Sequence, residues 1–404
     1  MVKLKKFVTI ALSAVLMTTA LTACSSSSDE SAAKDDGKGS VYYLNFKPES
    51  EEQWKKIAED YEKETGVPVK VVTAASGTYE QTLKSEIAKK DAPTLFQING
   101  PVGYEAWKEY CADLKDTQLY KDLLNQDMAV KSGDGVYGIP YVEEGYGIIY
   151  NQAIMDKYFA LDGAKAKSMD EINNFAKLKE VAEDMQSKKD QLGIDGVFAS
   201  TSLTPGEDWR WQTHLANLPV YYEYKDKNST NLDKIDFTYA ENFKNIFDLY
   251  INNSTCEPAL LGSKTVSDSM AEFALGKAAM VQNGNWGWGQ IAEVEGNTVK
   301  EDDVKFMPIY TGVEGEENQG LCSGTENCWA VNANAPQEDI DATIAFMKWL
   351  VTSEAGTKCM AEQFGEIPYK GAAANDNVFF QNASDCLKEG KYSVAWAFNY
   401  TPNV

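Results

Sequence analysis

Hydrophobic residues that follow the N-terminal segment alternate between the spacing of strands and the spacing of helices. Residues 49–64 carry apolar side chains at positions i, i+3, i+4 and i+7, which predicts a helix that ends at Gly66. Short apolar runs at 41–46, 67–73 and 94–98 predict strands, and a second helical series lies between the last two. This order predicts a parallel sheet whose strands are joined by crossover helices.

The alternation of strands and helices continues along the chain. A hairpin turn at residues 134–135 is followed by a predicted strand at 145–150 and a new series of helices, which indicates a crossing between two lobes. Helices are predicted at 170–188, 207–217, 240–252, 266–275 and 337–352. Further strands are predicted at 278–283, 305–310 and 329–332. We expect the last two of these strands to return to the first lobe.

Three loops follow the carboxyl ends of the first three predicted strands, at residues 45–49, 74–77 and 99–101. In open parallel sheets, ligands bind in the crevice beyond the carboxyl ends of the strands. We therefore expect these loops, which include Glu49 and Asn99, to line a ligand site.

The N-terminal segment has the order of a secretory signal, with three lysines before an uncharged run at residues 7–23. The run ends in LTAC at Cys24, which resembles a bacterial lipobox. The resemblance implies that the signal peptide 1–23 is removed and that Cys24 carries a diacylglyceryl anchor, with an uncleaved anchor helix as the alternative. Residues 24–40, rich in serine and charge and without aromatic residues, are predicted to form a disordered tether. We expect a lipoprotein on the extracellular face of a Gram-positive cell membrane.

The composition is that of a globular protein with an acidic surface. Of the 404 residues, 43% are hydrophobic and 11% aromatic, and the formal net charge is −23 at pH 7. This charge argues against nucleic acid as a partner, because binding to phosphates depends on clustered Lys and Arg. The length predicts a large core and two domains.

Motifs of common enzymes and metal sites do not occur in the sequence. The chain contains one histidine, His214, and one arginine, Arg210, and it has no HExxH, CxxC or P-loop motif. Residues 133–138 match GxGxxG but begin a hairpin rather than a helix, so they are interpreted as a turn. Glu143 and Glu144 are neighbours on a strand and face opposite sides, unlike the paired acids of glycosidases. We therefore expect no enzymatic activity, no cofactor and no metal.

Two tryptophan pairs, WRW at 209–211 and WGW at 286–288, are candidate stacking positions for a sugar. Flat aromatic rings bury a large area at low entropic cost, while acids, amides and a guanidinium bind hydroxyl groups. Trp286 and Trp288 are flanked by glycines, which let a ligand approach the backbone. Both are therefore predicted to contact the ligand.

The WRW pair lies in a predicted helix. Trp209 and Trp211 are two residues apart there and cannot share a face, so at most one of them is expected to meet the ligand. Arg210 is interpreted either as a ligand donor or as a member of a structural ion pair. His214 is interpreted as a structural residue.

Six cysteines follow Cys24, an even number that permits three disulfides outside the cytoplasm. The preferred pairs are Cys322 with Cys328 across a short loop and Cys359 with Cys386. Free thiols are the alternative.

Five segments, in order, resemble the signature blocks of family 1 extracellular solute-binding proteins, the relatives of maltose-binding protein that serve ABC importers. The segments are YEKETGVPVKVV, LKSEIAKKDAPTLFQI, YGIPYVEEGYGIIYNQAIMDKY, FALGKAAMVQNGNWGW and WAVNANAPQEDIDATIAFMKWLVTSEAGTKCMAEQFGEIPY. The resemblance implies an α/β fold in the form of a two-lobed, periplasmic-binding-protein-like clamp. Each lobe would be an open, mostly parallel sheet with flanking helices, and the chain would cross the hinge about three times.

The resemblance also implies how the chain is divided between the two lobes and what the protein does. Lobe 1 comprises 41–144 plus 303–350, and lobe 2 comprises 145–302 plus 351–404. The resemblance implies that a sugar, as an oligosaccharide, is held in the cleft and delivered to the transmembrane subunits of an ABC permease. The protein would act as a monomer that is attached to the membrane by its lipid. A surface-anchored glycoside hydrolase and a non-transport sugar sensor or adhesin are the alternatives.

The expected ligand-binding residues lie in the strand-end loops, at the first crossing, in the tryptophan pairs and near the third crossing. They are Glu49, Asn99, Tyr141, Glu143, Glu144, Trp209, Arg210, Asn285, Trp286, Trp288 and Trp329.

Overall fold

The computed structural model describes residues 37–75, 77–229, 232, 234–325, 327–375, 377–388 and 391–396. The predicted signal peptide, the lipidation site Cys24 and the tether as far as residue 36 lie outside this part of the chain. Ser40, the last residue of the predicted tether, donates its backbone N–H to Asp339 Oδ1 at 2.6 Å. In the part of the chain that is described, no helix is both long enough and apolar enough to cross a membrane.

The first sheet begins as the sequence predicts. β1 (Val41–Asn45) pairs in parallel with β2 (Val69–Thr73) on one side and with β3 (Leu95–Asn99) on the other. The strand order is β2-β1-β3-β11-β5-β4. The last three strands, all paired antiparallel, are β11 (Asn327–Val331), β5 (Gly135–Pro140) and β4 (Val130–Ser132).

Helix α1 (Glu51–Thr65) follows β1 and shows how apolar spacing places the core. Trp54 and Tyr61 are buried on the predicted helical stripe, and Trp54 packs edge-on against Tyr43 of β1 with ring centroids 4.8 Å apart. Gly66 ends the helix in the left-handed region at φ 74°, which glycine adopts without strain. The predicted start of the fold is thus confirmed.

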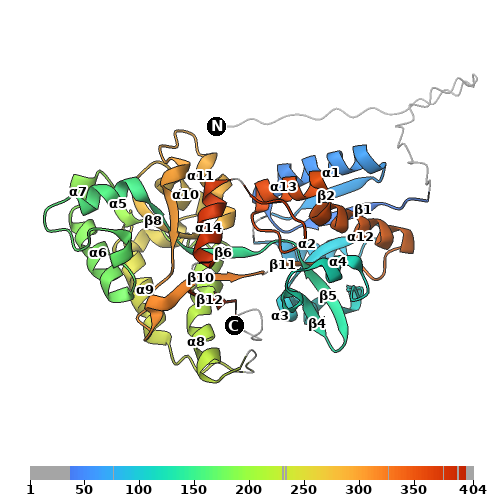
Figure 1. Cartoon of the computed structure of the whole chain (residues 1–404), viewed down its shortest axis with the longest axis horizontal. Coiled ribbons are helices and arrows are strands. Elements are labelled where there is room, and N and C mark those ends of the chain that lie inside the picture. The colour runs from blue at the N-terminus through green and yellow to red at the C-terminus, as the bar shows by residue number, and fades with distance from the viewer. Residues whose placement is uncertain are drawn as a thin grey trace, which may run out of the picture. The chain divides into compact units, whose positions relative to one another are not determined.

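Helices cover both faces of the first sheet (Figure 1). On β11, Trp329 and Val331 belong to the core beneath α1, while Cys328 and Ala330 belong to the core on the opposite face. The helices that pack into these two cores, besides α1, are α2 (Tyr79–Glu86), α3 (Gly100–Trp107), α4 (Gln118–Asp122), α12 (Gln337–Thr352) and α13 (Glu354–Phe364).

The second sheet is built around β6 (Glu144–Asn151), which pairs antiparallel with β8, β9 and β10. Parallel pairs are formed by β7 with β8 and by β12 with β10. These strands are β7 (Gly196–Phe198), β8 (Ala278–Gly284), β9 (Val304–Met307), β10 (Gln319–Gly324) and β12 (Tyr392–Ala395). Both sheets are therefore mixed, not mostly parallel as expected, because β6 and β11 follow connections between the sheets and pair antiparallel.

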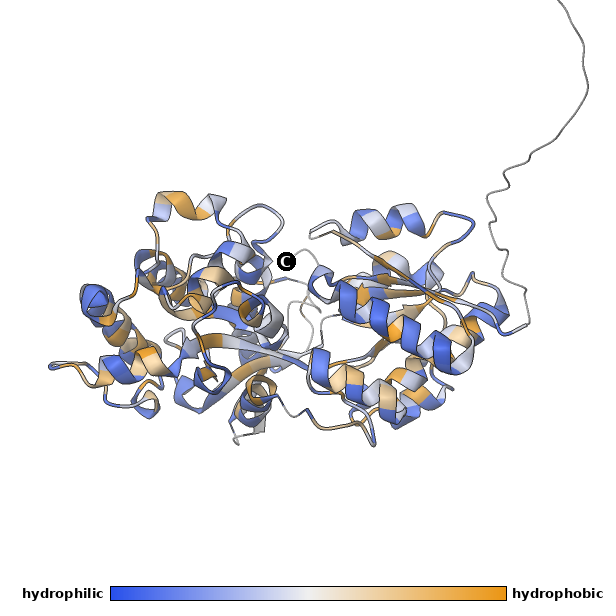
Figure 2. Cartoon of the chain, turned by 90° about the horizontal axis from the view of Figure 1, so that it is seen from above, coloured by the Kyte–Doolittle hydropathy of each residue, from blue (hydrophilic) through white to orange (hydrophobic). Residues whose placement is uncertain are grey.

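Helices also cover both faces of the second sheet, and Figure 2 shows that hydrophilic and hydrophobic residues alternate along them. One core contains residues of α5 (Gln152–Phe159), α6 (Phe175–Ser187), α7 (Lys189–Leu192), α8 (Asn217–Asp226) and α9 (Ala240–Asn252). The other contains residues of α10 (Val266–Ala274), α11 (Trp288–Ala292) and α14 (Val378–Lys388).

The chain passes between the two sets of cores between β5 and β6, between β10 and β11, and between α13 and α14. Three segments differ from the expected positions. One is β10, which pairs with β6 in the second sheet although the range 303–350 is predicted to belong to lobe 1. The strand predicted at 305–310 is β9 and pairs with β6, so it does not return to the first lobe. Helix α13 buries Met360 and Phe364 in the first core, although residues 351–404 were assigned to lobe 2. Strands and helices with a buried face fit either core, so their pattern alone does not assign them.

The six cysteines beyond Cys24 are free thiols, and neither predicted disulfide is formed. Cys322 lies on β10 of the second sheet, whereas Cys328 lies on β11 of the first. Cys359, on α13, packs against the first core, and Cys386, on α14, packs against the second. The short loop between Cys322 and Cys328 was a misleading signal, because the chain changes sheets there.

We predict that Trp54→Ala lowers the free energy of unfolding by about 3–5 kcal/mol, because it opens a cavity in the centre of the first core. Urea unfolding followed by circular dichroism measures the change. Lys56→Ala on the exposed side of the same helix is the control and should stay within about 0.5 kcal/mol of the unmodified chain. Equal effects of the two substitutions would contradict the assignment of the core.

Candidate functional site

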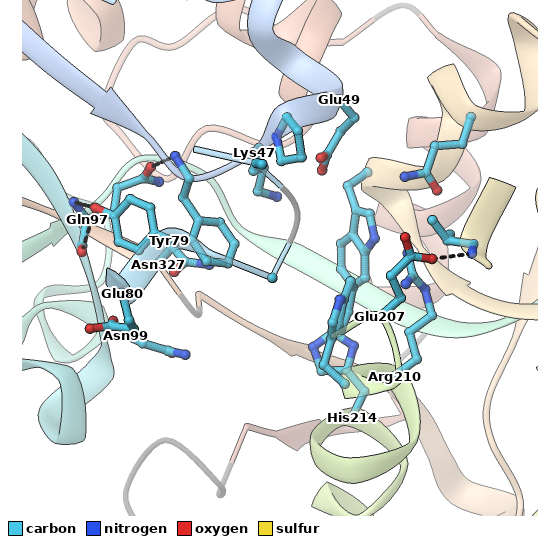
Figure 3. Close-up of a pocket in the computed structure, with 18 of the residues that line it drawn as sticks. Lys47, Glu49, Tyr79, Glu80, Gln97, Asn99, Glu207, Arg210, His214 and Asn327 are labelled. Atoms are coloured by element: carbon cyan, nitrogen blue, oxygen red, sulfur yellow. Dashed lines mark hydrogen bonds between the residues drawn. The ribbon is translucent and has the colours of Figure 1, made fainter. Parts of the chain in front are cut away.

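A cavity of about 570 Å³ lies between loops of the first sheet and elements of the second (Figure 3). The first sheet and its connections contribute Phe46, Lys47, Pro48, Glu49, Ala75, Gly77, Tyr79, Glu80, Gln81, Gln97, Asn99 and Asn327. The second sheet and its connections contribute Glu144, Glu207, Trp209, Arg210, His214, Val266, Ser267, Trp286 and Gln290.

The three loops predicted from the strand ends all line this cavity. Residues 46–49 follow β1, Ala75 and Gly77 follow β2, and Asn99 is the last residue of β3. The three strands are parallel, so their carboxyl ends meet at one edge of the sheet. The position of the cavity relative to the first sheet therefore follows from the strand pattern.

A buried ion pair between Lys47 and Glu144 lies on the cavity wall. Lys47 is 7% exposed in the loop after β1, and Glu144, 4% exposed, is the first residue of β6. Asn45 supports this loop, because its side chain donates to the Lys47 carbonyl at 2.7 Å and accepts from the Lys47 N–H at 3.1 Å. The pair thus connects the first sheet to the second directly beside the site.

An aromatic wall, formed by Trp209, His214 and Trp286, bounds the cavity on the side of the second sheet. The rings of Trp209 and Trp286 are 6.2 Å apart, and the His214 ring is 4.8 Å from Trp209 and 5.4 Å from Trp286. Behind them, Tyr146 stacks on His214 at 4.4 Å and donates its hydroxyl to the His214 carbonyl at 2.7 Å. A Cβ at Gly284 would overlap the Trp286 ring, which explains the glycine two residues before this tryptophan.

The two tryptophans of the WRW pair lie in different places, one at the cavity and one in the core. A π-helix spans Arg210–Leu215, and Trp209 precedes it and lines the cavity. Trp211 is buried in the core of the second sheet, where its ring packs against Tyr250 at 5.3 Å and its indole N–H donates to the Thr201 carbonyl. Of the two tryptophans, Trp209 lines the cavity and Trp211 does not.

Arg210 is 3% exposed and lines the cavity, with no carboxylate within 4 Å among the described residues. Its Nε donates to Asn283 Oδ1 at 3.2 Å, and its guanidinium carbon lies 4.0 Å from the Trp209 ring centroid. Burial lowers the pKa of the guanidinium to about 10, while Glu49 and Glu207 act in the opposite direction. Arg210 does not form the structural ion pair considered above, so its terminal N–H groups remain available as donors.

Carboxylates outnumber basic side chains on the cavity lining, with Glu49, Glu80, Glu144 and Glu207 against two basic residues. Glu207 accepts from the Val266 N–H at 2.7 Å. Glu80 accepts from the Trp107 indole at 3.0 Å, and burial raises the pKa of its carboxyl. In the described part of the chain, no group of three or more His, Cys, Asp or Glu side chains is arranged to hold a metal ion. The lining is therefore acidic and rich in hydrogen-bond acceptors.

The opposite wall is polar and held by its own hydrogen bonds (Figure 3). The Tyr79 hydroxyl donates to the Gln97 carbonyl at 3.0 Å and accepts from the Gln97 N–H at 2.7 Å. The Gln97 side-chain oxygen accepts from the Phe46 N–H at 2.8 Å. Asn99 and Asn327 lie on paired strands next to this cluster. The wall therefore offers amide and carboxylate groups toward the aromatic wall.

Six of the expected ligand-binding residues line the cavity, and five do not. Those that line it are Glu49, Asn99, Glu144, Trp209, Arg210 and Trp286. Of the others, Tyr141 and Trp329 are buried in the first core, where their rings stack at 4.9 Å. Trp288 stacks on Phe379 of α14 at 5.3 Å and does not face the cavity.

Glu143 and Asn285 support the first crossing instead of lining the cavity. The backbone N–H of Glu143 donates to the Glu366 carbonyl at 2.9 Å. The Asn285 side chain accepts from the Gly145 N–H at 3.4 Å and donates to the Glu143 carbonyl at 3.5 Å. The Glu366 contact joins the first crossing to the third, and the Asn285 contacts join the first crossing to the loop after β8.

Several lining residues were missed by the sequence analysis. Lys47 stood inside a predicted loop, but its partner is 97 positions away, so no local pattern marked the pair. Glu207 lies just before the WRW pair, which was a usable signal. His214 was interpreted as structural, and the π-helix that turns it toward Trp209 has no sequence signature.

The family of bacterial extracellular solute-binding proteins matches the chain over residues 56–385. Over 136 residues, the chain is 32% identical to the melibiose/raffinose/stachyose-binding protein MelE of Bacillus subtilis, and this match spans 33% of the chain and 32% of MelE. The chain thus matches about a third of that relative's length. It is 24% identical over 380 residues to the multiple sugar-binding protein of Streptococcus mutans, with 89% of the chain and 82% of the relative covered.

Solved structures have the same fold. RafE in complex with raffinose superposes with a TM-score of 0.67 at 17% identity, covering 89% of this chain and 90% of that one. A sugar transporter protein of Bacillus licheniformis in complex with stachyose gives a TM-score of 0.60 at 19% identity, covering 90% and 91%. These likenesses establish the two-lobed α/β fold.

We predict that Lys47→Met and Glu144→Gln each lower the free energy of unfolding by about 3–5 kcal/mol, because each leaves a buried charge without its partner. The double variant should lose much less than the sum of the two, since it removes both charges. Urea unfolding of all four proteins gives the coupling energy. Strictly additive losses would show that the pair is not coupled.

Proposed function

Because this chain belongs to the family of bacterial extracellular solute-binding proteins, we propose that it captures an oligosaccharide for an ABC importer and presents it to the permease. The cavity between the two sheets is the binding site. The six expected residues that line it, together with Lys47, Glu207 and His214, are the proposed ligand contacts.

One observation carries the proposal, namely the aromatic wall of Trp209, His214 and Trp286 opposite amide and carboxylate groups. A sugar ring has apolar C–H faces and a rim of hydroxyl groups. The two indole rings suit the faces, while the carboxylates and the Arg210 donors suit the rim. The names of MelE and of the Streptococcus mutans relative agree with this chemistry and make melibiose, raffinose and stachyose the first candidates.

The energetics of this site suit reversible capture. A micromolar dissociation constant corresponds to about 8.2 kcal/mol of binding free energy. Each aromatic contact adds about 0.5–1.5 kcal/mol beyond area burial, and each hydrogen bond to a charged group about 1.5–3 kcal/mol. A ligand that touches both walls stabilises the arrangement in which the walls are close, and so selects the closed form of the clamp.

We propose that the protein binds its ligand without chemical change. Hydrolysis of a glycosidic bond needs two carboxyl groups that face the same bond. Glu144 is engaged by Lys47, and Glu143 does not line the cavity. The adjacent acids of the first crossing therefore lack that arrangement.

We further propose that Cys24 carries a lipid anchor, so that a monomer is held by its tether at the extracellular face of the membrane. The LTAC sequence and the charged, serine-rich segment after it support this proposal. The transmembrane subunits of the permease are the proposed partners of the closed form.

We predict that one class of neutral oligosaccharide raises the thermal unfolding midpoint by a few degrees, because a ligand at a hundred times its Kd adds about 2.7 kcal/mol to the folded state. Trp286→Ala should abolish the shift, since it removes a stacking ring. Trp288→Ala is the matched control, because the Trp288 ring stacks on Phe379 outside the cavity. The sugar should still raise the unfolding midpoint of this variant. If no sugar raises the unfolding midpoint and another class of compound does, the sugar proposal is overturned.

We also predict that oligosaccharides containing a uronic acid bind at least tenfold more weakly than neutral ones of the same length. The reason is the excess of carboxylates on the lining, which repel a carboxylate ligand in a partly buried site. Calorimetric titration with both sugars measures the ratio, and Glu207→Gln should reduce it. Tighter binding of the acidic sugar would contradict the prediction.

A further inference from the structure

A second, smaller cavity of about 220 Å³ adjoins the proposed sugar site. Val266, Ser267 and Gln290 line both cavities, so the two adjoin at these residues. The second cavity extends between α10 and α11, where Met270, Gly289, Glu293 and Val294 complete its lining. We propose that this groove is an additional subsite that holds one more sugar unit of a longer oligosaccharide. The inference rests on the proposed function and specifies the length of ligand that the site selects.

A chain of hydrogen bonds connects the two cavities. Arg210 Nε donates to Asn283 Oδ1 at 3.2 Å, and Asn283 Nδ2 donates to Gln290 Oε1 at 3.2 Å and to Met270 Sδ at 3.3 Å. Asn283 is buried and uses both ends of its amide in this chain. Gln290 is thereby held by its oxygen, and its amide N–H groups have no hydrogen-bond partner among the described residues. These donors lie at the junction, where a bridging sugar unit would pass.

The lining of the groove suits one sugar ring. Val266 and Val294 provide apolar surface for a C–H face, while Gln290 and Glu293 provide a donor and an acceptor for hydroxyl groups. We expect the volume of about 220 Å³ to accommodate a single pyranose ring. No aromatic residue lines the groove, so we expect it to add to the affinity of the main cavity rather than to bind a monosaccharide alone.

The groove is formed only by elements that pack on the second sheet. All its lining residues lie on α10, on α11 or directly after α11. The capping box of Thr265 and Asp268 fixes the start of α10, and Glu207 accepts from the Val266 N–H at 2.7 Å. Because both helices pack on the second sheet, we expect the groove to keep its shape when the clamp opens and closes. A long ligand therefore has a preformed contact before closure.

The test fills the groove without touching the main cavity. Gly289 lines only the second cavity, and a Cβ there meets a single atom within 4 Å, Glu293 Oε1 at 4.0 Å. A Cβ therefore fits at this position, and we expect Gly289→Phe to place its ring in the groove. Ala292→Phe is the matched control, because Ala292 is exposed on the same helix and lines neither cavity. Glu293→Phe is a second filling variant if Gly289→Phe does not fold.

We would measure dissociation constants by calorimetry for melibiose, raffinose and stachyose, which lengthen by one unit at each step, and for a second series, the malto-oligosaccharides. The unmodified chain should gain about tenfold in affinity at the length that first reaches the groove, a change of about 1.4 kcal/mol. Gly289→Phe should remove this gain and leave shorter sugars unaffected, while Ala292→Phe should change neither.

Equal affinity for all lengths of a bound series would overturn the subsite and leave the proposed function intact. An equal loss for short and long sugars in Gly289→Phe would also overturn it, because the effect would then arise in the main cavity. Absence of binding by any sugar of either series would overturn the proposed function and the subsite together.

Discussion

The site depends on the burial of Lys47 against Glu144, because this ion pair joins the loop after β1 to the first residue of β6. Two charges taken out of water are costly unless each satisfies the other. The loop and the strand must therefore keep their relative position, and the Asn45 side chain holds the loop from behind. The Lys47 ammonium also lies 5.5 Å from the centroid of the Trp286 ring. One interaction thus relates the polar wall on the first sheet to the aromatic wall on the second.

The aromatic wall is itself held in place before any ligand arrives. Trp209 stacks on the guanidinium of Arg210, whose Nε is bound by the buried side chain of Asn283. The same asparagine orients Gln290, so the stacking ring, the donor fork and the edge of the adjoining groove share one support. Side chains fixed in this way lose little conformational freedom when a ligand binds. One buried amide thus supports several residues on the second sheet's side of the site.

The location of the site could be predicted from the sequence more completely than the residues that line it. Parallel strands bring their carboxyl ends to one edge, so the three strand-end loops followed from local spacing alone. Which aromatic rings face the cavity depends on contacts between distant segments. Trp329 and Tyr141 stack on each other in the first core, although their motif positions resembled ligand contacts. His214 reaches the wall beside Trp209 because a π-helix alters the angular spacing of side chains, and no sequence pattern indicates that change.

The loop at 284–288 shows why neighbouring residues of one motif separate in function. Trp286 faces the cavity, while the side chain of Asn285 connects the Gly145 N–H to the Glu143 carbonyl at the first crossing. Adjacent side chains in a tight turn point in different directions, so Trp286 lines the cavity and Asn285 contacts the first crossing. Under the proposed function, a ligand that stacks on Trp286 would act next to the backbone of the first crossing that Asn285 holds. We propose that ligand binding and hinge rotation are coupled through this peptide unit.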